Sequence, residues 1–159
     1  RYPPAGKRGV GAMVARASRW GAVEGYMTDA DDGICVIVQA ETRAALRDIS
    51  GIAQVEGVDA VFIGPADLAA DLGHPGAPGH PEVRAVIEAG VSAILAAGKA
   101  AGTIAFDPAE RRACEALGIT FLGVGADAIA LGEALERLLR DGSWSGAIPD
   151  EDRGWEVGP

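Results

Sequence analysis

Short apolar runs and longer amphipathic stretches follow one another along most of the chain. Apolar runs that end at Gly, Pro or an acidic residue are typical of strands in a parallel sheet, and the stretches between them are typical of helices. The predicted strands are residues 34–38, 59–64, 100–106 and 121–125. The predicted helices are residues 43–54, 82–97, 108–117 and 126–140, with a short helical turn beginning at Pro65. No hairpin signal joins consecutive strands, so the pattern predicts a parallel sheet with right-handed crossovers.

The predicted fold is α/β, in the form of about four strand–helix units. Such a sheet is either open and doubly wound or closed into a barrel, and four units make half of a β/α (TIM) barrel. We expect residues 1–140 to be the C-terminal half of such a barrel and residues 141–159 to be an irregular tail. The opening Arg1-Tyr2-Pro3-Pro4 is typical of the exit from a structural element, which favours a fragment without its N-terminal part. A half-barrel is expected to expose an edge strand and apolar faces.

Charge and composition narrow the possible functions. The net charge of −9 argues against partners such as nucleic acid or an anionic membrane surface, because both require basic patches. No apolar run approaches the ~20 residues of a membrane span, and no signal-peptide pattern opens the chain. The two cysteines lack metal-site spacing, and Cys35 is interpreted as a buried apolar residue of the first strand. The expected compartment is the cytoplasm.

Two predicted strands each lead into an acidic residue. Gln39 and Glu41 share one face of the first strand, where two polar side chains are costly unless something binds them. Asp67 follows the second strand at a matching position. Neighbouring parallel strands lie ~4.8 Å apart, so the two carboxylates can reach one hard cation such as Mg²⁺ or Mn²⁺. The alternative is that Glu41 and Asp67 are exposed acids stabilised at helix N-termini.

Further candidate positions surround this pair. The turn formed by Gly64, Pro65 and Ala66 allows close approach of a ligand, and the N–H of Ala66 can receive a small carboxylate. Ile104 is either an apolar wall of the site or a core residue.

Two groups of basic or titratable residues have simpler structural interpretations. His74 and His80 lie in a Gly/Pro loop, where a role in turn structure is favoured over catalysis or metal binding. Lys7 and Arg8 are interpreted as a solvated basic loop, with attraction of an acidic substrate as the alternative.

Four segments together resemble the HpcH/HpaI aldolase/citrate lyase family. They are Arg1 to Gly9, Val38 to Thr42, Val55 to Asp59 and Phe62 to Leu68. The similarity extends from residue 1 to about residue 140, and it is strongest to the aldolases of 4-hydroxy-2-oxoheptanedioate and 2-dehydro-3-deoxyglucarate. It implies a β/α barrel and a class II aldolase that cleaves or forms a C–C bond in 4-hydroxy-2-oxo acids, giving pyruvate and an aldehyde.

The resemblance also implies roles for individual residues. Glu41 and Asp67 match the ligands of Mg²⁺, Mn²⁺ or Co²⁺, which stabilises a pyruvate enolate. Gln39 matches a residue beside pyruvate, Gly64 to Ala66 match the turn that receives its carboxylate, and Ile104 matches a residue of the aldehyde pocket.

The family's catalytic histidine and substrate-binding arginine lie on earlier strands and match nothing in this chain. We therefore assign no catalytic residue and expect the fragment to be inactive alone. The full-length protein is expected to be a homo-oligomer. The alternatives are a citrate-lyase-β-like enzyme acting on acyl-CoA and a non-catalytic, metal-binding remnant.

Overall fold

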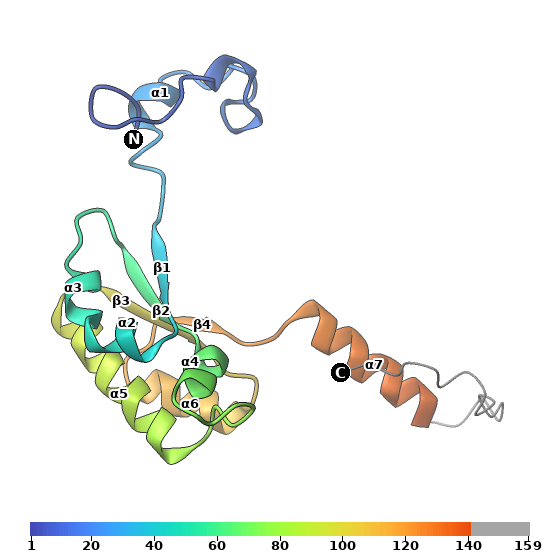
Figure 1. The fold of residues 1–159 in the computed structure, drawn as a ribbon. Helices are drawn as coiled ribbons and strands as arrows, with labels where there is room; N and C mark the ends of the chain where they lie inside the picture. Colours follow the sequence, from blue (N-terminus) through green and yellow to red (C-terminus); the bar gives the residue numbers. More distant parts are fainter. Residues whose placement is uncertain (141–159) are drawn as a thin grey trace, which may run out of the picture.

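A computed structural model describes residues 1–140 and contains one four-stranded parallel sheet. The strands are β1 (Ile37–Ala40), β2 (Ala60–Ile63), β3 (Ala100–Ile104) and β4 (Phe121–Gly123). They lie side by side in chain order, β1-β2-β3-β4 (Figure 1). The predicted parallel α/β architecture is therefore confirmed.

Helices connect the strands as the crossovers of a parallel sheet require. They are α2 (Arg43–Arg47), α3 (Ile49–Ala53), α4 (Pro65–Asp71), α5 (Pro81–Ala96), α6 (Pro108–Ala116) and, after β4, α7 (Asp127–Arg140). The segment before β1 contains η1 (Ala12–Val14), η2 (Arg16–Ser18) and α1 (Tyr26–Asp29). Helices α2 to α6 gather on one side of the sheet (Figure 1).

Local capping explains where several helices begin. The hydroxyl of Thr42 accepts a hydrogen bond from Ala45 N at 3.1 Å, which caps α2 directly before the predicted helix start at residue 43. The predicted helix over 43–54 is nevertheless two helices, because Asp48 leaves the helical conformation at φ −104° and ψ 19°. The carboxylate of Asp107 accepts from Ala109 N at 2.7 Å and Glu110 N at 3.1 Å, and Pro108 opens α6. Gly118 follows α6 with φ +88°, a conformation that favours glycine.

The first strand starts later than predicted. The backbone of Val36 already bonds to Asp59, through the Asp59 carboxylate at 2.7 Å and the Asp59 N–H at 2.9 Å, but the ladder of β1 begins at Ile37. Cys35 therefore precedes the strand and is exposed, so its interpretation as a buried strand residue is wrong. Among the described strands, β1 lies at the edge of the sheet and pairs with β2 alone.

The two faces of the sheet differ. One face carries Ala40, Val61, Ile63 and Ala101, and it packs under the helices as a buried core with residues such as Leu68 and Ile94. The register pairs Gln39 with Phe62, Phe62 with Gly102, and Gly102 with Phe121 on the opposite face. This second face, called the open face below, has no helix over it among residues 1–140. Ile37 is 40% exposed and Phe121 is 48% exposed there, as expected for half of a barrel.

The chain extends away from the sheet at both of its described ends (Figure 1). Residues 1–33 form a separate group of turns and short helices joined to β1 by an extended link. Helix α7 has no buried residue, and its leucines 131, 135, 138 and 139 are 51–68% exposed. The predicted irregular tail, residues 141–159, lies outside the described residues.

Candidate functional site

The carboxyl ends of β1 and β2 bring the first candidate residues together. Ala40 pairs with Ile63, and the ladder continues through a hydrogen bond from Gly64 N to Ala40 O at 3.1 Å. Glu41 is thus level with Gly64, one residue beyond each strand. This register places the Glu41 side chain on the same face as Gln39, as the period of two predicts.

Gln39 holds the carboxylate of Glu41 in place. The Gln39 amide Nε2 donates a hydrogen bond to Glu41 Oε2 at 2.6 Å, and both side chains lie on the open face. Within residues 1–140, no Lys, Arg or His forms an ion pair with Glu41 or with Asp67. The carboxylate of Glu41 is therefore oriented by a neutral donor, and its charge is not compensated by a protein cation.

Gly64 leaves the space into which these side chains fit. A Cβ atom on Gly64 would lie 2.8 Å from Gln39 Nε2, 3.0 Å from Glu41 Oε2 and 3.1 Å from Glu41 Cβ. Any residue can adopt the φ of −83° found at Gly64. Glycine is therefore required here because of the limited space and not because of the backbone conformation. The sequence suggested close approach of a ligand here, whereas the structure shows close approach of Gln39 and Glu41.

Pro65, Ala66 and Asp67 form the first turn of α4. Pro65 takes the first helical position, and Gly64 has no side chain with which to cap the N–H groups of this turn. Asp67 is exposed, and its carboxylate makes no hydrogen bond or ion pair within the described part of the chain. Asp67 therefore follows the same strand end as Gly64 and forms no hydrogen bond with the Gln39–Glu41 pair.

Ile104 lies farther along the open face, at the end of β3. It pairs with Gly123 of β4, where an added Cβ would meet Ile104 Cγ1 at 3.0 Å. On the same face, the rings of Phe62 and Phe121 pack edge to face above Gly102 of β3, with centroids 6.0 Å apart. Ile104 is outside the buried core cluster and contributes to an apolar surface beside the polar strand ends.

The basic loop lies apart from these residues. The Arg8 guanidinium packs over the Tyr2 ring at 4.6 Å and donates to the Tyr26 hydroxyl at 3.5 Å. All three residues belong to the segment before β1, which extends away from the sheet (Figure 1). This geometry does not bring Arg8 to Glu41 or Asp67.

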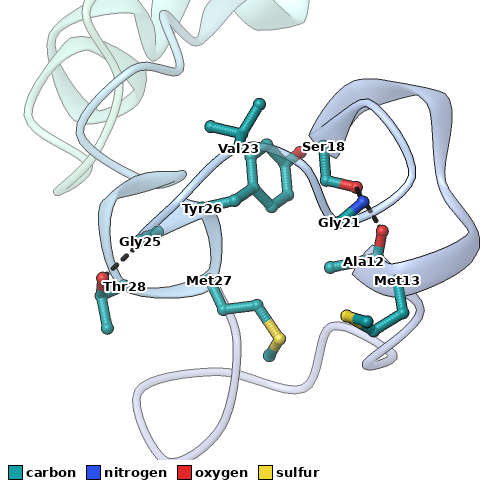
Figure 2. A pocket seen from close by; sticks show the side chains of 9 residues that line it. All are labelled: Ala12, Met13, Ser18, Gly21, Val23, Gly25, Tyr26, Met27 and Thr28. Atoms are coloured by element: carbon teal, nitrogen blue, oxygen red, sulfur yellow. Dashed lines mark hydrogen bonds between the residues drawn. The ribbon is translucent and has the colours of Figure 1, made fainter.

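A hollow of about 220 Å³ in the same segment offers little chemistry (Figure 2). It is lined by Ala12, Met13, Ser18, Gly21, Val23, Gly25, Tyr26, Met27 and Thr28. The Ser18 hydroxyl is already bonded to the carbonyls of Ala12 and Ala15, and the Thr28 hydroxyl to that of Gly25. No carboxylate, imidazole or thiol faces it, so the strand ends remain the better candidate.

A second group of titratable side chains lies in the loop between α4 and α5. His74 and His80 stack there, and Glu82 lies next to them. The hydrogen bond from His74 lowers the pKa of the Glu82 carboxyl. Sequence reasoning found the turn role of this loop and missed the clustering, for which the only signal was the run His-Pro-Gly-Ala-Pro-Gly-His-Pro over residues 74–81.

Comparison with known proteins identifies relatives over most of the chain. Residues 1–134 match a family model described as HpcH/HpaI aldolase/citrate lyase. The 2-keto-3-deoxy-L-rhamnonate aldolase of Klebsiella pneumoniae is 52% identical over 151 residues, which are 95% of this chain and 57% of that protein.

Two solved structures share the fold. One is a HpcH/HpaI aldolase/citrate lyase family protein from Burkholderia cenocepacia, with a TM-score of 0.82 and 37% identity over 89% of this chain and 56% of that chain. The other is a HpcH/HpaI aldolase from Desulfitobacterium hafniense, with a TM-score of 0.76 and 31% identity over 89% of this chain and 55% of that chain. The chain spans about half the length of the relatives it matches.

The length and apolar character of the helices show whether any of them could cross a membrane. None of the helices formed by residues 1–140 combines the length and the apolar character that crossing a bilayer requires.

Proposed function

The chain belongs to the HpcH/HpaI aldolase/citrate lyase family, and from this premise we propose that Glu41 and Asp67 hold a divalent metal for a class II aldolase reaction. The observation that carries the proposal is the arrangement at the strand ends. Gln39 orients Glu41 over Gly64, and no protein cation neutralises the carboxylates of Glu41 and Asp67 within the described residues. An oxygen-only donor set without a protein cation fits Mg²⁺, Mn²⁺ or Co²⁺.

The proposed substrates are 4-hydroxy-2-oxo acids, which are cleaved to pyruvate and an aldehyde or formed from them. The relatives support a free 2-oxo acid over an acyl-CoA, because those at 52–53% identity are named 2-keto-3-deoxy-L-rhamnonate aldolases. A bound divalent metal supplies Lewis-acid stabilisation of the negative charge that develops on the 2-oxo oxygen.

In the proposed reaction, the residues of this chain bind the substrate and orient the metal ligand Glu41. Gln39 fixes the rotamer of Glu41 and lies beside the pyruvate part of the substrate. The uncapped first turn of α4 supports a role for the Ala66 N–H as a donor to the substrate carboxylate. Ile104, on the apolar part of the open face, is proposed to face the aldehyde part.

Metal binding by isothermal titration calorimetry tests the proposal. We expect Mn²⁺ to bind more tightly in the presence of pyruvate, because the substrate adds oxygen ligands to those of the protein. Glu41→Gln removes a charged ligand and should weaken Mn²⁺ binding roughly tenfold or more. Glu88→Gln, which removes an exposed acid on α5, is the matched control and should bind as the parent does.

Two results would argue against this function. If Glu41→Gln and Asp67→Asn both left Mn²⁺ affinity unchanged, the carboxylates would not be its ligands. If Mn²⁺ bound through them but pyruvate had no effect, the chain would instead be a metal-binding remnant without an aldolase-type site.

We also propose that the protein acts in the cytoplasm as a homo-oligomer. The exposed leucines of α7 support association, since an amphipathic helix is stabilised when its apolar face is covered.

A further inference from the structure

The loop between α4 and α5 is built from two consecutive turns. Ala77 N donates to His74 O at 3.0 Å, and His80 N donates to Ala77 O at 3.0 Å. Pro75 and Pro78 each follow the first residue of a turn, where the fixed φ of proline is favourable. Gly76 follows Pro75 with φ +75°, as a type II turn requires at that place. Local sequence therefore folds the loop so that His74 and His80 meet.

Both ends of the loop are attached to helices. His74 N donates to Ala69 O of α4 at 2.8 Å. His80 is the N-cap of α5, and its Nδ1 accepts from Glu82 N at 3.3 Å. The loop is thus held in place mainly by backbone hydrogen bonds, and only the His80 Nδ1 contact uses an imidazole ring.

Three potential metal ligands converge at this point. The rings of His74 and His80 stack with centroids 3.6 Å apart, and His74 Nε2 lies 2.8 Å from Glu82 Oε2. One ligand atom from each of the three residues lies within 4.8 Å of the others. The His74 side chain is 24% exposed and that of Glu82 is 54% exposed, so the group is accessible from solvent.

Two arginines lie near this group, and one of them is paired with an acid. Arg43 is one of the groups that lower the pKa of Glu82; its backbone N donates to Asp71 Oδ2 at 2.6 Å, and its guanidinium Nη2 donates to the Asp71 carbonyl oxygen at 3.4 Å. Arg84, on the next turn of α5, pairs with Glu110 at 3.6 Å. Arg84 is therefore paired with an acidic side chain, whereas the Arg43 guanidinium is held by a backbone carbonyl and keeps its charge near Glu82.

We propose that His74, His80 and Glu82 bind a divalent transition metal, Zn²⁺ in the first instance. Two imidazoles and one carboxylate suit Zn²⁺, and three protein ligands leave a fourth tetrahedral position for water. Mg²⁺ prefers oxygen ligands alone and should not bind here. The site lies beyond the C-terminal end of α4, whereas Asp67 lies in its first turn, about 6 Å along the helix axis before Asp71 at 1.5 Å per residue.

Binding changes the geometry of the group in a defined way. Stacked rings direct their nitrogen lone pairs nearly parallel, whereas ligands of one ion must converge on it. Zn–N distances of about 2.0–2.1 Å therefore require the stack to open and the direct 2.8 Å contact between His74 Nε2 and Glu82 Oε2 to be replaced by contacts with the ion. The single 3.3 Å contact of His80 Nδ1 leaves that ring free to turn. The bound ion would then link the loop residues His74 and His80 to Glu82 in the first turn of α5.

The histidine content of the chain makes a direct test possible. The sequence contains only two histidines, so imidazole nitrogen NMR reports on this site alone. During a Zn²⁺ titration of the unmodified chain at neutral pH, we expect both histidines to shift together and to saturate at one ion per chain. Mg²⁺ at the same concentrations should shift neither. A shift of only one histidine, or of none, overturns the proposal.

Variants then identify the ligands. His74→Ala, His80→Ala and Glu82→Gln should each weaken Zn²⁺ binding roughly tenfold or more, with Glu88→Gln on the same helix as the unchanged control. Zinc affinity at or near the parent value in any of the three ligand variants contradicts the assignment. Circular dichroism checks that each variant folds. If a variant does not fold, the NMR titration of the histidines in the unmodified chain is by itself the test of the zinc site.

The site is independent of the proposed function. In Glu41→Gln, the Zn²⁺-dependent shift of both histidines should persist, whatever happens to Mn²⁺ and pyruvate binding. Loss of the histidine shifts in Glu41→Gln would contradict a separate site, whereas loss of pyruvate-enhanced Mn²⁺ binding alone would concern only the aldolase proposal.

Discussion

At the scale of single residues, Gly64 controls the space in which the candidate ligand is placed. The atoms nearest to an added Cβ belong to Gln39 and Glu41, the two side chains that the proposed metal site needs in a fixed arrangement. The ends of flexible side chains can move aside, so a larger residue is expected to harm the geometry more than the fold.

Gly64→Ala is therefore predicted to weaken metal binding strongly while lowering the stability of the fold only slightly. Displacement of the Gln39 amide and the Glu41 carboxylate should weaken Mn²⁺ affinity roughly tenfold or more, by calorimetry. The free energy of unfolding in urea should fall by only about 1 kcal/mol. Gly125→Ala, where no atom lies within 4 Å of the added Cβ, is the control and should affect neither. Unchanged Mn²⁺ affinity in Gly64→Ala would refute the steric role of this glycine.

The two cysteines are predicted to differ in reactivity. Cys35 is exposed, whereas partial burial raises the pKa of the Cys114 thiol, with Glu110 and Glu115 adding to the effect. Alkylation requires the thiolate, so Cys114 should stay protonated to a higher pH than a free thiol. Mass spectrometry after iodoacetamide treatment at neutral pH should find Cys35 modified first, and the difference should shrink as pH rises. Faster modification of Cys114 would contradict this burial.

At the scale of elements, side-chain caps decide where the helices of this sheet begin. Thr42 and Asp107 each accept backbone hydrogen bonds from the first turn of the helix that follows them, α2 and α6 respectively. These contacts are formed by neighbours in the sequence, which explains why both starts were predictable from residue types.

Removal of the Asp107 cap should destabilise the fold measurably. Asp107→Ala leaves two N–H groups of α6 without a protein acceptor, and the expected loss is about 0.5–2 kcal/mol of unfolding free energy in urea. Glu115→Ala, at the C-terminal end of the same helix, is the matched control because an acid there opposes the helix dipole. It should have no destabilising effect. Equal destabilisation by both variants would argue against the cap.

At the scale of the whole molecule, the sheet is covered on one face only. The open face carries Gln39, Glu41, Phe62, Phe121 and Ile104 without an opposing layer among the described residues. In a barrel, the remaining strands would face these residues and complete the site from the other side.

The 159-residue chain alone is predicted to show no aldolase turnover. Family resemblance places the catalytic histidine and the substrate arginine on earlier strands, and the only two histidines of this sequence stack on each other beside Glu82. A retro-aldol assay coupled to pyruvate detection, with Mg²⁺ or Mn²⁺ added, measures this. Pyruvate added to the same mixture verifies detection, and robust turnover of a 4-hydroxy-2-oxo acid would contradict the prediction.

The sequence by itself determined the succession of strands and helices, the alternation of faces in β1 and the position of each acid after its strand. These features follow from the conformational preferences of a few neighbouring residues and from the apolar period. The same local preferences did not locate the break at Asp48 or the late start of β1, because both depend on how the edge strand and its helix pack.

Only the tertiary structure decided which side chains meet. The hydrogen bond from Gln39 to Glu41 above Gly64 requires the register of β1 against β2, and that register is set by burial of the opposite face. The stack of His74 on His80 requires two turns to close in succession. Pairwise distances of this kind depend on the summed geometry of many residues, which no local pattern specifies.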